Sequence, residues 1–367
     1  MRKLKIKPDP DFNRLLNILK HRSITDRVPF FEIWTDIEVE HKVLEMTGQL
    51  KNDEKNFNKD ELLSLGNEKR LRKHIRYMYN LGYDYINVEA VDENLLFPRM
   101  EMSRTMTREG YRNYIRGSDK VIENNKDFEE YPWPDMDSID YSAYELAADL
   151  IPDGMKVISL SSGPLEITMG ILGFEGISYL LYENEKLVSD TFEAVSIRIL
   201  DYFDRLASLD VIGALVLGDD MGFKTSTMLS PKVYRKFLFP WHKKMVEIIH
   251  KHGKPAIIHS CGNLKHIMHD IISCGWDAKH SFEDGIQPIW EAKKEYGDEL
   301  AVLGGFDMDK LCRMNEEETR IHTRFLIEKC YSGGGWALGS GNTVTNYINI
   351  FNLLAMLEEG FNFNGDQ

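Results

Sequence analysis

A histidine and a cysteine two positions apart, His259 and Cys261, are the residues of this chain best suited to chemistry. They follow a short apolar run at 254–258 that has the composition of a buried strand. Side chains alternate along a strand, so residues two apart project to the same side. Imidazole nitrogen and thiolate sulfur are both ligands that zinc accepts. The pair therefore predicts a metal site at the carboxyl end of a strand.

A third candidate ligand, Glu283, lies just beyond the next strand-like run, at 276–281. A carboxylate completes a set of nitrogen, sulfur and oxygen donors of the kind that binds zinc, so His259, Cys261 and Glu283 are the predicted ligands. A second interpretation stays open, in which His259 and Cys261 are ordinary core residues, because free cysteine is often buried. Glu283, beside Asp284, would then be a solvated acid at a strand end.

The elements that must position these residues alternate along the chain. Short apolar runs predict eight strands, at 28–34, 83–88, 156–160, 211–217, 255–259, 276–281, 300–304 and 335–339. Helical periodicity predicts helices at 175–183, 187–206, 231–252, 314–331 and 347–359. This alternation predicts the α/β class and a single (β/α)8 TIM barrel, with functional residues at the carboxyl ends of the strands. No linker or second core interrupts the pattern, so residues 1–367 are predicted to form one domain.

One long segment departs from this rhythm. Residues 92–147 separate the second and third predicted strands and carry many charges. A connection of that length is usually an elaborated loop, and it would leave the functional face of the barrel. The segment is therefore predicted to be an insertion that either covers the mouth as a lid or decorates the surface.

Three aspartates are predicted to have catalytic roles because of where they stand. Asp219 and Asp220 follow the fourth predicted strand, and Asp307 follows the seventh. An acid at the carboxyl end of a barrel strand commonly faces the active site. The sequence does not decide which of Asp219 and Asp220 does so, and each could instead cap the following loop.

Composition excludes several classes of function. The net charge of −14 argues against nucleic acid as a partner. The basic residues at 1–7 have no apolar run behind them, and no apolar run reaches the ~18 residues of a membrane helix. We therefore expect neither a signal peptide nor a membrane span. The four cysteines form no CxxC motif, which fits a protein of the reducing cytoplasm.

With these elements in place, the sequence resembles the uroporphyrinogen decarboxylase superfamily, over roughly residues 155 to 360. The matching pieces are Gly218-Asp219-Asp220-Met221-Gly222, Leu229-Ser230-Pro231-Lys232-Val233-Tyr234, Pro240-Trp241, His259-Ser260-Cys261-Gly262, Gly304-Gly305-Phe306-Asp307 and Gly333-Gly334-Gly335-Trp336. The superfamily contains porphyrinogen decarboxylases and corrinoid-dependent (methylcobamide) methyltransferases. The methyltransferase branch keeps a His-x-Cys pair at the fifth strand, as this chain does, so the resemblance is closest to that branch.

Two departures from the family patterns refine this interpretation. The decarboxylases carry an arginine-rich signature, Arg-Gln-Ala-Gly-Arg, near their first strand, and it holds substrate carboxylates. The corresponding stretch here contains Glu32 and Asp36 and no arginine, so a substrate with many carboxylates would be repelled. The thiol-methylating members supply another cysteine after the eighth strand, where this chain has Asn342. A zinc with one thiolate is a better Lewis acid than one with two, which favours an oxygen-bound methyl group.

The sequence therefore predicts a zinc-dependent methyltransferase that moves a methyl group between a small methylated donor, such as a methyl ether, and a corrinoid. The resemblance implies that the corrinoid is carried by a separate partner protein, and no Asp-x-His-x-x-Gly cobalamin motif occurs here. Two alternatives remain: a decarboxylase-like lyase acting on a tetrapyrrole, and a non-catalytic barrel that binds a ligand. Whether the protein forms a homodimer also stays open.

Overall fold

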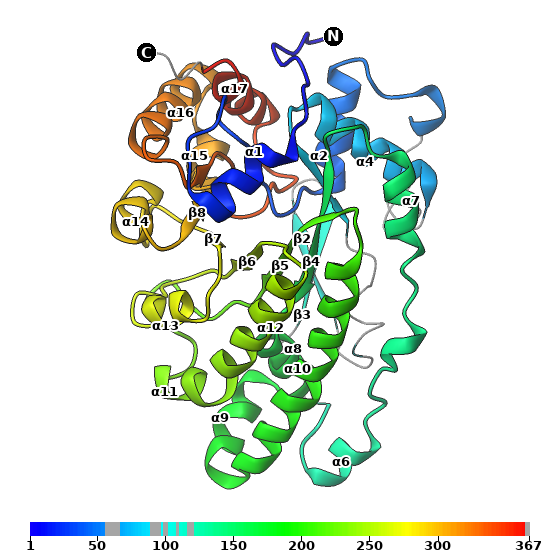
Figure 1. Ribbon diagram of the computed structural model, residues 1–367, viewed down its shortest axis with the longest axis vertical. Helices are drawn as coiled ribbons and strands as arrows, with labels where there is room; N and C mark the ends of the chain where they lie inside the picture. The colour runs from blue at the N-terminus through cyan, green and yellow to red at the C-terminus, as the bar shows by residue number, and fades with distance from the viewer. Residues whose placement is uncertain (56–66, 89–96, 98–101, 108–109, 116–120, 364–367) are drawn as a thin grey trace.

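The structure is a computed structural model that describes residues 1–55, 67–88, 97, 102–107, 110–115 and 121–363. Seven strands form one curled parallel sheet, in the order β1-β4-β5-β6-β7-β8-β9 (Figure 1). Their bounds are β1 (Tyr85–Val88), β4 (Lys156–Ser162), β5 (Ile212–Gly218), β6 (Ala256–His259), β7 (Ala278–His280), β8 (Ala301–Leu303) and β9 (Trp336–Ala337). Each strand overlaps one of the predicted strands. The predicted α/β class is confirmed, and the curled sheet is consistent with a TIM-like barrel.

Helices alternate with these strands and are arranged around them in Figure 1. In the first half of the chain they are α1 (Phe12–Leu16), η1 (Asn17–His21), α2 (Ile37–Met46), η2 (Asn52–Glu54), α4 (Glu68–Asn80), α6 (Asn125–Glu130), η3 (Met136–Ser138), α7 (Ser142–Leu150), α8 (Pro164–Leu172) and α9 (Phe174–Glu183). In the second half they are α10 (Glu185–Ser208), α11 (Pro231–Val233), η4 (Tyr234–Leu238), α12 (Phe239–Lys251), α13 (Met268–Ser273), α14 (Ile289–Tyr296), α15 (Met308–Arg313), α16 (Glu316–Cys330) and α17 (Ile350–Phe361). The predicted helix at 231–252 is thus divided into three pieces, with a π-helical turn in η4.

The first predicted strand, at 28–34, forms isolated bridges instead of a regular strand. These bridges join Phe30 to Leu338 and Thr35 to Val344, both in parallel orientation. The backbone N–H of Phe31 donates to Leu338 O at 2.8 Å, and the N–H of Leu338 donates to Pro29 O at 2.8 Å. Pro29 has no N–H to donate, so the ladder cannot continue from Pro29 toward residue 28. The segment nevertheless lies beside the β9 edge of the sheet.

The opposite edge of the sheet reaches the same segment through side chains. The Tyr85 hydroxyl, on β1, accepts from the Glu32 N–H at 2.7 Å and donates to Glu32 O at 2.8 Å. The Asn87 side chain, also on β1, donates to Ile33 O at 3.1 Å. The Phe31 ring packs with its centroid 6.0 Å from that of Tyr85. Residues 29–35 therefore lie between the two edges of the curled sheet.

The predicted insertion at 92–147 is partly visible. It contains an antiparallel hairpin of β2 (Met102–Thr107) and β3 (Gly110–Ile115), followed by α6, η3 and α7. Residues 92–96, 98–101, 108–109 and 116–120 lie outside the described residues. The prediction that this segment acts as a lid therefore stays untested.

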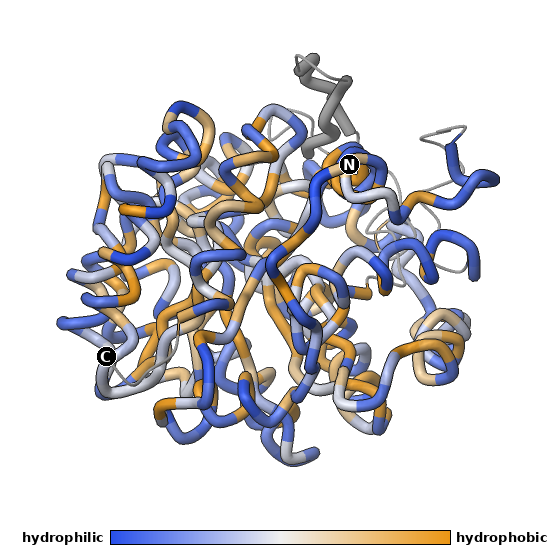
Figure 2. Tube along the Cα trace, turned by 90° about the horizontal axis from the view of Figure 1, so that it is seen from above, coloured by the Kyte–Doolittle hydropathy of each residue, from blue (hydrophilic) through white to orange (hydrophobic). Residues whose placement is uncertain are grey.

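The core lies between the sheet and the inner faces of the helices. Every residue of β1 and of β5 is buried, as expected for parallel strands that are covered on both faces. In Figure 2 many blue, hydrophilic stretches lie at the periphery of the tube and orange stretches run through its interior. Within the described ranges, none of the helices combines the length and the apolar character that crossing a bilayer requires.

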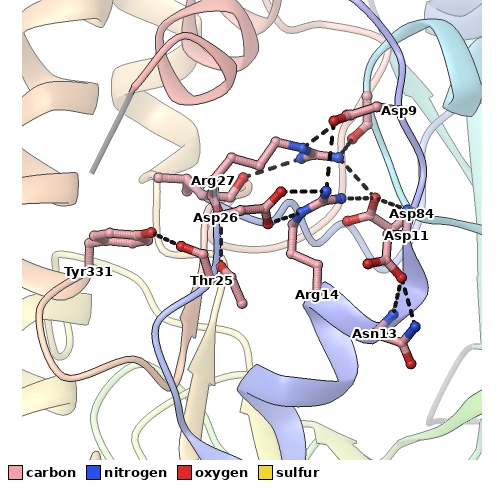
Figure 3. A network of polar contacts seen from close by, with 11 residues as sticks. Asp9, Asp11, Asn13, Arg14, Thr25, Asp26, Arg27, Asp84 and Tyr331 are labelled. Atoms are coloured by element: carbon pink, nitrogen blue, oxygen red, sulfur yellow. Dashed lines mark hydrogen bonds and ion pairs between the residues drawn. The ribbon is translucent and has the colours of Figure 1, made fainter. Parts of the chain in front are cut away.

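A buried ion-pair network fastens the amino-terminal end of the sheet (Figure 3). Asp84, which directly precedes β1, is 2% exposed and accepts from Arg14 at 2.6 Å and from Arg27 at 2.9 Å. Arg14 also binds Asp26 at 2.7 Å, and the backbone N–H of Asp11 donates to Asp84 at 3.0 Å. Because Asp84 precedes its strand, this network lies at the end of the sheet opposite the strands' carboxyl ends. Its role is structural.

We expect Asp84→Ala to destabilise the protein by roughly 3–5 kcal/mol, because it leaves two buried guanidinium groups without their shared carboxylate. Urea unfolding followed by circular dichroism measures the change. The matched control is Asp190→Ala, which removes an exposed pair with Lys186 and should cost at most about 0.5 kcal/mol. Equal losses in the two variants would contradict a structural role for the Asp84 network.

Candidate metal centre

Strand register brings the candidate residues to one place. Gly218 of β5 pairs with His259 of β6, and His259 pairs with His280 of β7. Three neighbouring strands therefore end at the same level, and the residues that follow them gather at the carboxyl edge of the sheet. Asp220 follows β5 and Cys261 follows β6, so both stand at this edge.

Two glycines allow the loops after β5 and β6 to touch. Gly262 has a φ of +86°, a left-handed conformation that favours glycine, and a Cβ atom there would lie 2.1 Å from Gly222 O. A side chain at Gly222 would meet the backbone of Asn263 at 2.8 Å. The glycines of the two sequence motifs are therefore explained by direct backbone packing, which fixes Asp220 next to Cys261.

Asp220, His259 and Cys261 form a compact group of donor atoms. Cys261 Sγ lies 3.5 Å from His259 Nε2, which lies 3.9 Å from Asp220 Oδ1. One ligand atom from each residue lies within 4.8 Å of the other two. The backbone N–H of Cys261 donates to Asp220 Oδ1 at 2.7 Å and holds the carboxylate in place. The structure thus brings two of the predicted zinc ligands together with one of the predicted catalytic aspartates.

The spacing of these donor atoms can be compared with that of a tetrahedral zinc site. Zinc bonds of about 2.0 Å to nitrogen and oxygen and about 2.3 Å to sulfur place neighbouring ligand atoms about 3.3–3.6 Å apart. The observed separations of 3.5 Å between sulfur and nitrogen and 3.9 Å between nitrogen and oxygen are close to these values. The three residues therefore offer donor atoms of the types that zinc accepts, and the sulfur–nitrogen separation matches a tetrahedral site while the nitrogen–oxygen separation is longer.

A chain of hydrogen bonds fixes which nitrogen of His259 faces this group. His280 Nε2 lies 3.1 Å from Ser340 O, which can only accept, so Nε2 carries the proton. Burial holds the pKa of His280 well below its usual value, so the ring is neutral and its Nδ1 is bare. That Nδ1 accepts from His259 Nδ1–H at 2.8 Å. His259 Nε2 is then left unprotonated, with its lone pair available to a metal, and the partner on its other nitrogen orients the ring.

Burial disfavours charge on every member of the group. It lowers the pKa of His259 to about 3, with a further contribution from Lys279. It raises the pKa of the Cys261 thiol, and the nearby charge of Asp220 raises it further. It also raises the pKa of Asp220. A bound cation would reverse the last two effects, because it stabilises both thiolate and carboxylate and displaces their protons.

Asp219 and Asp220 point to different parts of the molecule. Asp219 is fully buried and its Oδ2 lies 2.8 Å from His242 Nε2. Its oxygens also accept the backbone N–H groups of Leu165 at 3.3 Å and Glu166 at 2.9 Å, in the first turn of α8. Asp219 therefore caps a helix and holds the β4 and β5 ends together, while Asp220 faces the donor group.

The two remaining predicted site residues lie outside this group. Asp307 Oδ1 accepts from the N–H groups of Asp309 and Lys310 in α15, and Oδ2 accepts from the Asp284 N–H at 3.0 Å. Asp307 thus acts as a helix N-cap, and its predicted catalytic role stays untested. Glu283 lines a neighbouring cavity of about 140 Å³. Burial, then Asp307 and Asp220, raise the pKa of Glu283. Among the described residues, the group of ligand atoms within 4.8 Å of one another contains Asp220, His259 and Cys261 and not Glu283.

Lys279 is a site residue that the sequence analysis did not single out. It is 3% exposed, and its Nζ donates to Ser260 O at 3.2 Å and to Ser281 O at 2.7 Å. Its Nζ also lies 4.2 Å from the centroid of the Phe282 ring. Lys279 joins the loops after β6 and β7 directly behind Cys261. A lysine within an otherwise buried strand was the signal that could have found it.

Asn342 faces the donor group from the loop after β9. Its Nδ2 donates to Cys261 Sγ at 3.1 Å. Asn342, the position compared in the sequence with a cysteine of the thiol-methylating members, therefore donates its amide hydrogen to the sulfur of Cys261. Cys261 Sγ also lies 3.7 Å from Ser281 Oγ. The side chains of His259, Ser281 and Asn342 therefore surround the sulfur.

Glu32 and Asp36, the acids that stand in place of the arginine signature, do not face a mouth. Glu32 is 1% exposed and binds Ser340, and Asp36 is 9% exposed and accepts from the Asn346 N–H at 2.8 Å. The expectation that they repel an anionic substrate is therefore wrong, because carboxyl groups that are buried and hydrogen-bonded cannot contact a substrate. They fasten the amino-terminal segment to the loop after β9.

Comparison with known proteins places this fold and site in a family. A sequence profile of the uroporphyrinogen decarboxylase (URO-D) family matches residues 110–360, more than half of the chain. The chain belongs to the uroporphyrinogen decarboxylase family, and the resemblance found in the sequence is confirmed. No curated protein matches the chain in sequence.

A solved structure shares the fold of this chain. A methyltransferase from Methanosarcina mazei is similar to this chain with a TM-score of 0.70 and 14% identity, over 96% of this chain and 98% of that chain. At this identity the likeness shows a shared fold. A structure of the pneumococcal virulence factor StrH matches 80% of this chain and 79% of that chain at 12% identity, and its TM-score of 0.40 carries no argument.

The adjacent aspartates allow a direct test of their different surroundings. We expect Asp219→Ala to cost roughly 2–4 kcal/mol in the free energy of unfolding, because buried donors on His242 and α8 lose their acceptor. Asp220→Ala removes one hydrogen bond at a half-buried position and should cost about 1 kcal/mol. Urea denaturation of both variants measures the difference, and a reversed order would show that we have assigned the two aspartates wrongly.

Proposed function

We propose that this protein is a zinc-dependent methyltransferase that moves a methyl group between a small methylated substrate and a corrinoid carried by a separate protein. The observation that carries the proposal is the group of donor atoms of Asp220, His259 and Cys261 at the carboxyl edge of the sheet. Membership of the uroporphyrinogen decarboxylase family and the fold shared with a methyltransferase support it.

The proposed ligand set contains His259, Cys261 and one carboxylate. Asp220 is favoured as that carboxylate because its Oδ1 lies 3.9 Å from His259 Nε2. Glu283 remains the alternative, since it lines the adjacent cavity and since burial, then Asp307 and Asp220, raise its pKa. When bound, zinc would act as a Lewis acid that polarises the atom carrying the methyl group.

The chain's own residues would prepare this chemistry. His280 fixes the tautomer of His259, so that the Nε2 lone pair is available without a proton transfer. Burial lowers the pKa of the Lys279 ammonium to about 8, against the charges of Cys261, Asp220 and Glu283, which raise it. The Lys279 ammonium therefore compensates part of the anionic charge that the ligands gain when they lose their protons.

The surroundings of Cys261 bear on the substrate class. The set holds one thiolate, and the Asn342 amide donates a hydrogen bond to its sulfur at 3.1 Å. Both features withdraw electron density from a bound metal and increase its strength as a Lewis acid. That favours polarising an oxygen, as in the demethylation of a methyl ether, over activating a thiol.

The state of the cysteines bears on the cellular compartment of the protein. All four cysteines are free, which agrees with a cytoplasmic protein.

A tetrapyrrole decarboxylase would need cationic groups for several substrate carboxylates. Lys279 is already committed to two backbone carbonyls, and Glu32 and Asp36 occupy the place of the arginine signature. The decarboxylase alternative therefore remains the weaker proposal.

We expect the purified protein to bind about one zinc ion per chain, and Cys261→Ala to abolish tight binding, because it removes the thiolate of the ligand set. Elemental analysis and a competition titration with a coloured chelator measure this. Cys312→Ala is the matched control, since Cys312 is a half-buried cysteine in α15 outside the donor group. Protein that contains no metal after purification without chelator, and takes up none from added zinc, would rule out the site.

The same titration decides which carboxylate belongs to the site. Asp220→Asn is expected to weaken zinc binding by about tenfold or more, and Glu283→Gln to leave it within about threefold. The reverse result would move the carboxylate ligand to Glu283. Circular dichroism on both variants confirms that each is folded before affinities are compared.

Methyl transfer itself is testable through the corrinoid. Cob(I)alamin is a strong nucleophile, so the protein needs to position and polarise the donor. We expect methylcobalamin, followed by its visible spectrum, to form with methoxylated aromatics before methylamines, methanol or methylated thiols. Corrinoid proteins encoded nearby in the genome should be supplied as carriers in parallel with free cobalamin. Conversion of uroporphyrinogen to coproporphyrinogen, with no methyl transfer from any donor, would favour the lyase alternative.

A further inference from the structure

Three consecutive residues after β9 each contact a different member of the donor group's surroundings. We call residues 340–342 the β9 turn. Ser340 O accepts from His280 Nε2–H at 3.1 Å, and Gly341 O accepts from the Ser281 hydroxyl at 2.9 Å. Asn342 Nδ2 donates to Cys261 Sγ at 3.1 Å. One short turn therefore controls the histidine relay and two of the contacts around the cysteine sulfur.

Close packing leaves this turn little freedom of its own. A Cβ atom at Gly341 would lie 2.5 Å from Phe282 O, so a glycine is needed for the turn to reach the loop after β7. The backbone N–H of Gly341 donates to Phe306 O at 2.7 Å, and Phe282 N–H donates to Gly341 O at 3.2 Å. The turn therefore bonds to the loops after β7 and β8.

Glu32, which lies near the other end of the chain, contacts the β9 turn through its buried carboxyl group. Its Oε1 accepts from the Ser340 backbone N–H at 2.7 Å, and its Oε2 lies 2.5 Å from the Ser340 hydroxyl. Glu32 is itself fixed, because both its N–H and its carbonyl bond to the Tyr85 hydroxyl. The carboxyl group is 1% exposed, so water does not share its hydrogen bonds.

Counting hydrogens around Ser340 indicates the protonation state of Glu32. Ser340 Oγ lies 2.5 Å from Glu32 Oε2 and 2.9 Å from Asn342 O. A hydroxyl has one hydrogen to donate, and a backbone carbonyl can only accept. If the Ser340 hydrogen goes to Asn342 O, the hydrogen in the 2.5 Å contact must come from the carboxyl group. Both contacts are then satisfied when Glu32 is a neutral acid.

The groups around Glu32 also favour its neutral form. The titratable groups that interact with it are the hydroxyls of Tyr77 on α4, Tyr83 before β1 and Tyr85 on β1. Within the described ranges, the ion pairs of the structure include no cation paired with Glu32. Burial is the largest effect and raises the pKa of Glu32 to about 8, against the hydrogen bonds from Ser340 that lower it.

We propose that Glu32 is a positioning residue: a neutral carboxylic acid that clamps the β9 turn and thereby sets the orientation of His259 and the surroundings of the Cys261 sulfur. The clamp acts along two routes. One runs from Ser340 through His280 to His259 Nδ1, and the other runs from Ser340 through the turn to the amide of Asn342. The link to metal binding rests on the proposed function, whereas the protonation of Glu32 does not.

Infrared spectroscopy tests the neutral acid without any metal. The difference spectrum between the parent protein and Glu32→Gln should contain the carbonyl band of a protonated carboxyl group, and that band should shift in heavy water. Subtracting the variant isolates Glu32 from the other buried acids. A difference spectrum that contains carboxylate bands in place of this one would overturn the neutral-acid assignment, whatever the protein's function.

Metal binding tests the positioning role. Glutamine offers the same pattern as the neutral acid, a carbonyl for the Ser340 N–H and an N–H for the Ser340 hydroxyl. Glu32→Gln should therefore keep the affinity for cobalt(II) or zinc within about threefold, while Glu32→Ala should lower it roughly 10–100-fold. The sulfur-to-cobalt absorption band should move in Glu32→Ala and stay in place in Glu32→Gln, a change that lost stability alone does not produce.

Two further variants separate the outcomes. Asp36→Ala is the matched control, because Asp36 is a buried acid of the same segment that binds Asn346, beyond the β9 turn. It should leave metal affinity unchanged. Ser340→Ala removes the hydroxyl alone and covers the case in which Glu32→Ala does not fold, and it should weaken metal binding as Glu32→Ala does. Folded Glu32→Ala or Ser340→Ala with parental affinity would overturn the positioning role, and a parent protein that binds neither metal would instead overturn the proposed function.

Discussion

The hydrogen bond between His259 and His280 is the interaction on which the candidate site depends. It exists because β6 and β7 pair in a register that places the two histidines side by side, with 2.8 Å between their Nδ1 atoms. Both rings are buried and neutral, so the proton on each ring is dictated by its neighbour. The acceptor at the end of this chain is the Ser340 carbonyl, and the free lone pair at its other end belongs to His259 Nε2. The register of β6 and β7 thereby determines that His259 Nε2 carries no proton.

Burial at the same site makes charge on its donor groups unfavourable. Burial raises the pKa of Cys261 and of Asp220 and lowers that of His259, and the ammonium of Lys279 is held nearby by two carbonyls. Ionisable groups whose pKa values are strongly shifted by their surroundings occur more often at functional sites than elsewhere. A purely structural cluster would gain stability from neutral side chains of similar size, as buried charges generally cost free energy. The arrangement is therefore consistent with the metal site proposed above.

The sequence allowed the strands and the chemical pair to be predicted, because both rest on local patterns. Apolar runs marked β1 and β4–β9, and the alternation of side chains along a strand placed His259 and Cys261 on one side. What it could not decide was set by tertiary contacts. Asp219 and Asp220 are adjacent and chemically identical, and only the position of α8 and His242 separates a helix cap from a site residue. Glu32 was expected to repel an anionic substrate, because the sequence gives no sign that Ser340, 308 positions away, is its partner.

The amino-terminal segment connects these levels. Residues 27–36 carry three contacts in succession: Arg27 binds Asp84 at the base of β1, Glu32 binds Ser340, and Asp36 binds Asn346. The segment forms isolated bridges where a regular strand was predicted: backbone hydrogen bonds join it to the β9 side of the sheet, and side chains join it to β1. Backbone ladders tolerate almost any residue, whereas these three contacts require particular ones. Because the middle contact also sets the β9 turn, the closure of the fold and the geometry around Cys261 depend on the same few side chains. The closure of the fold and the geometry of the candidate site are therefore coupled at Glu32.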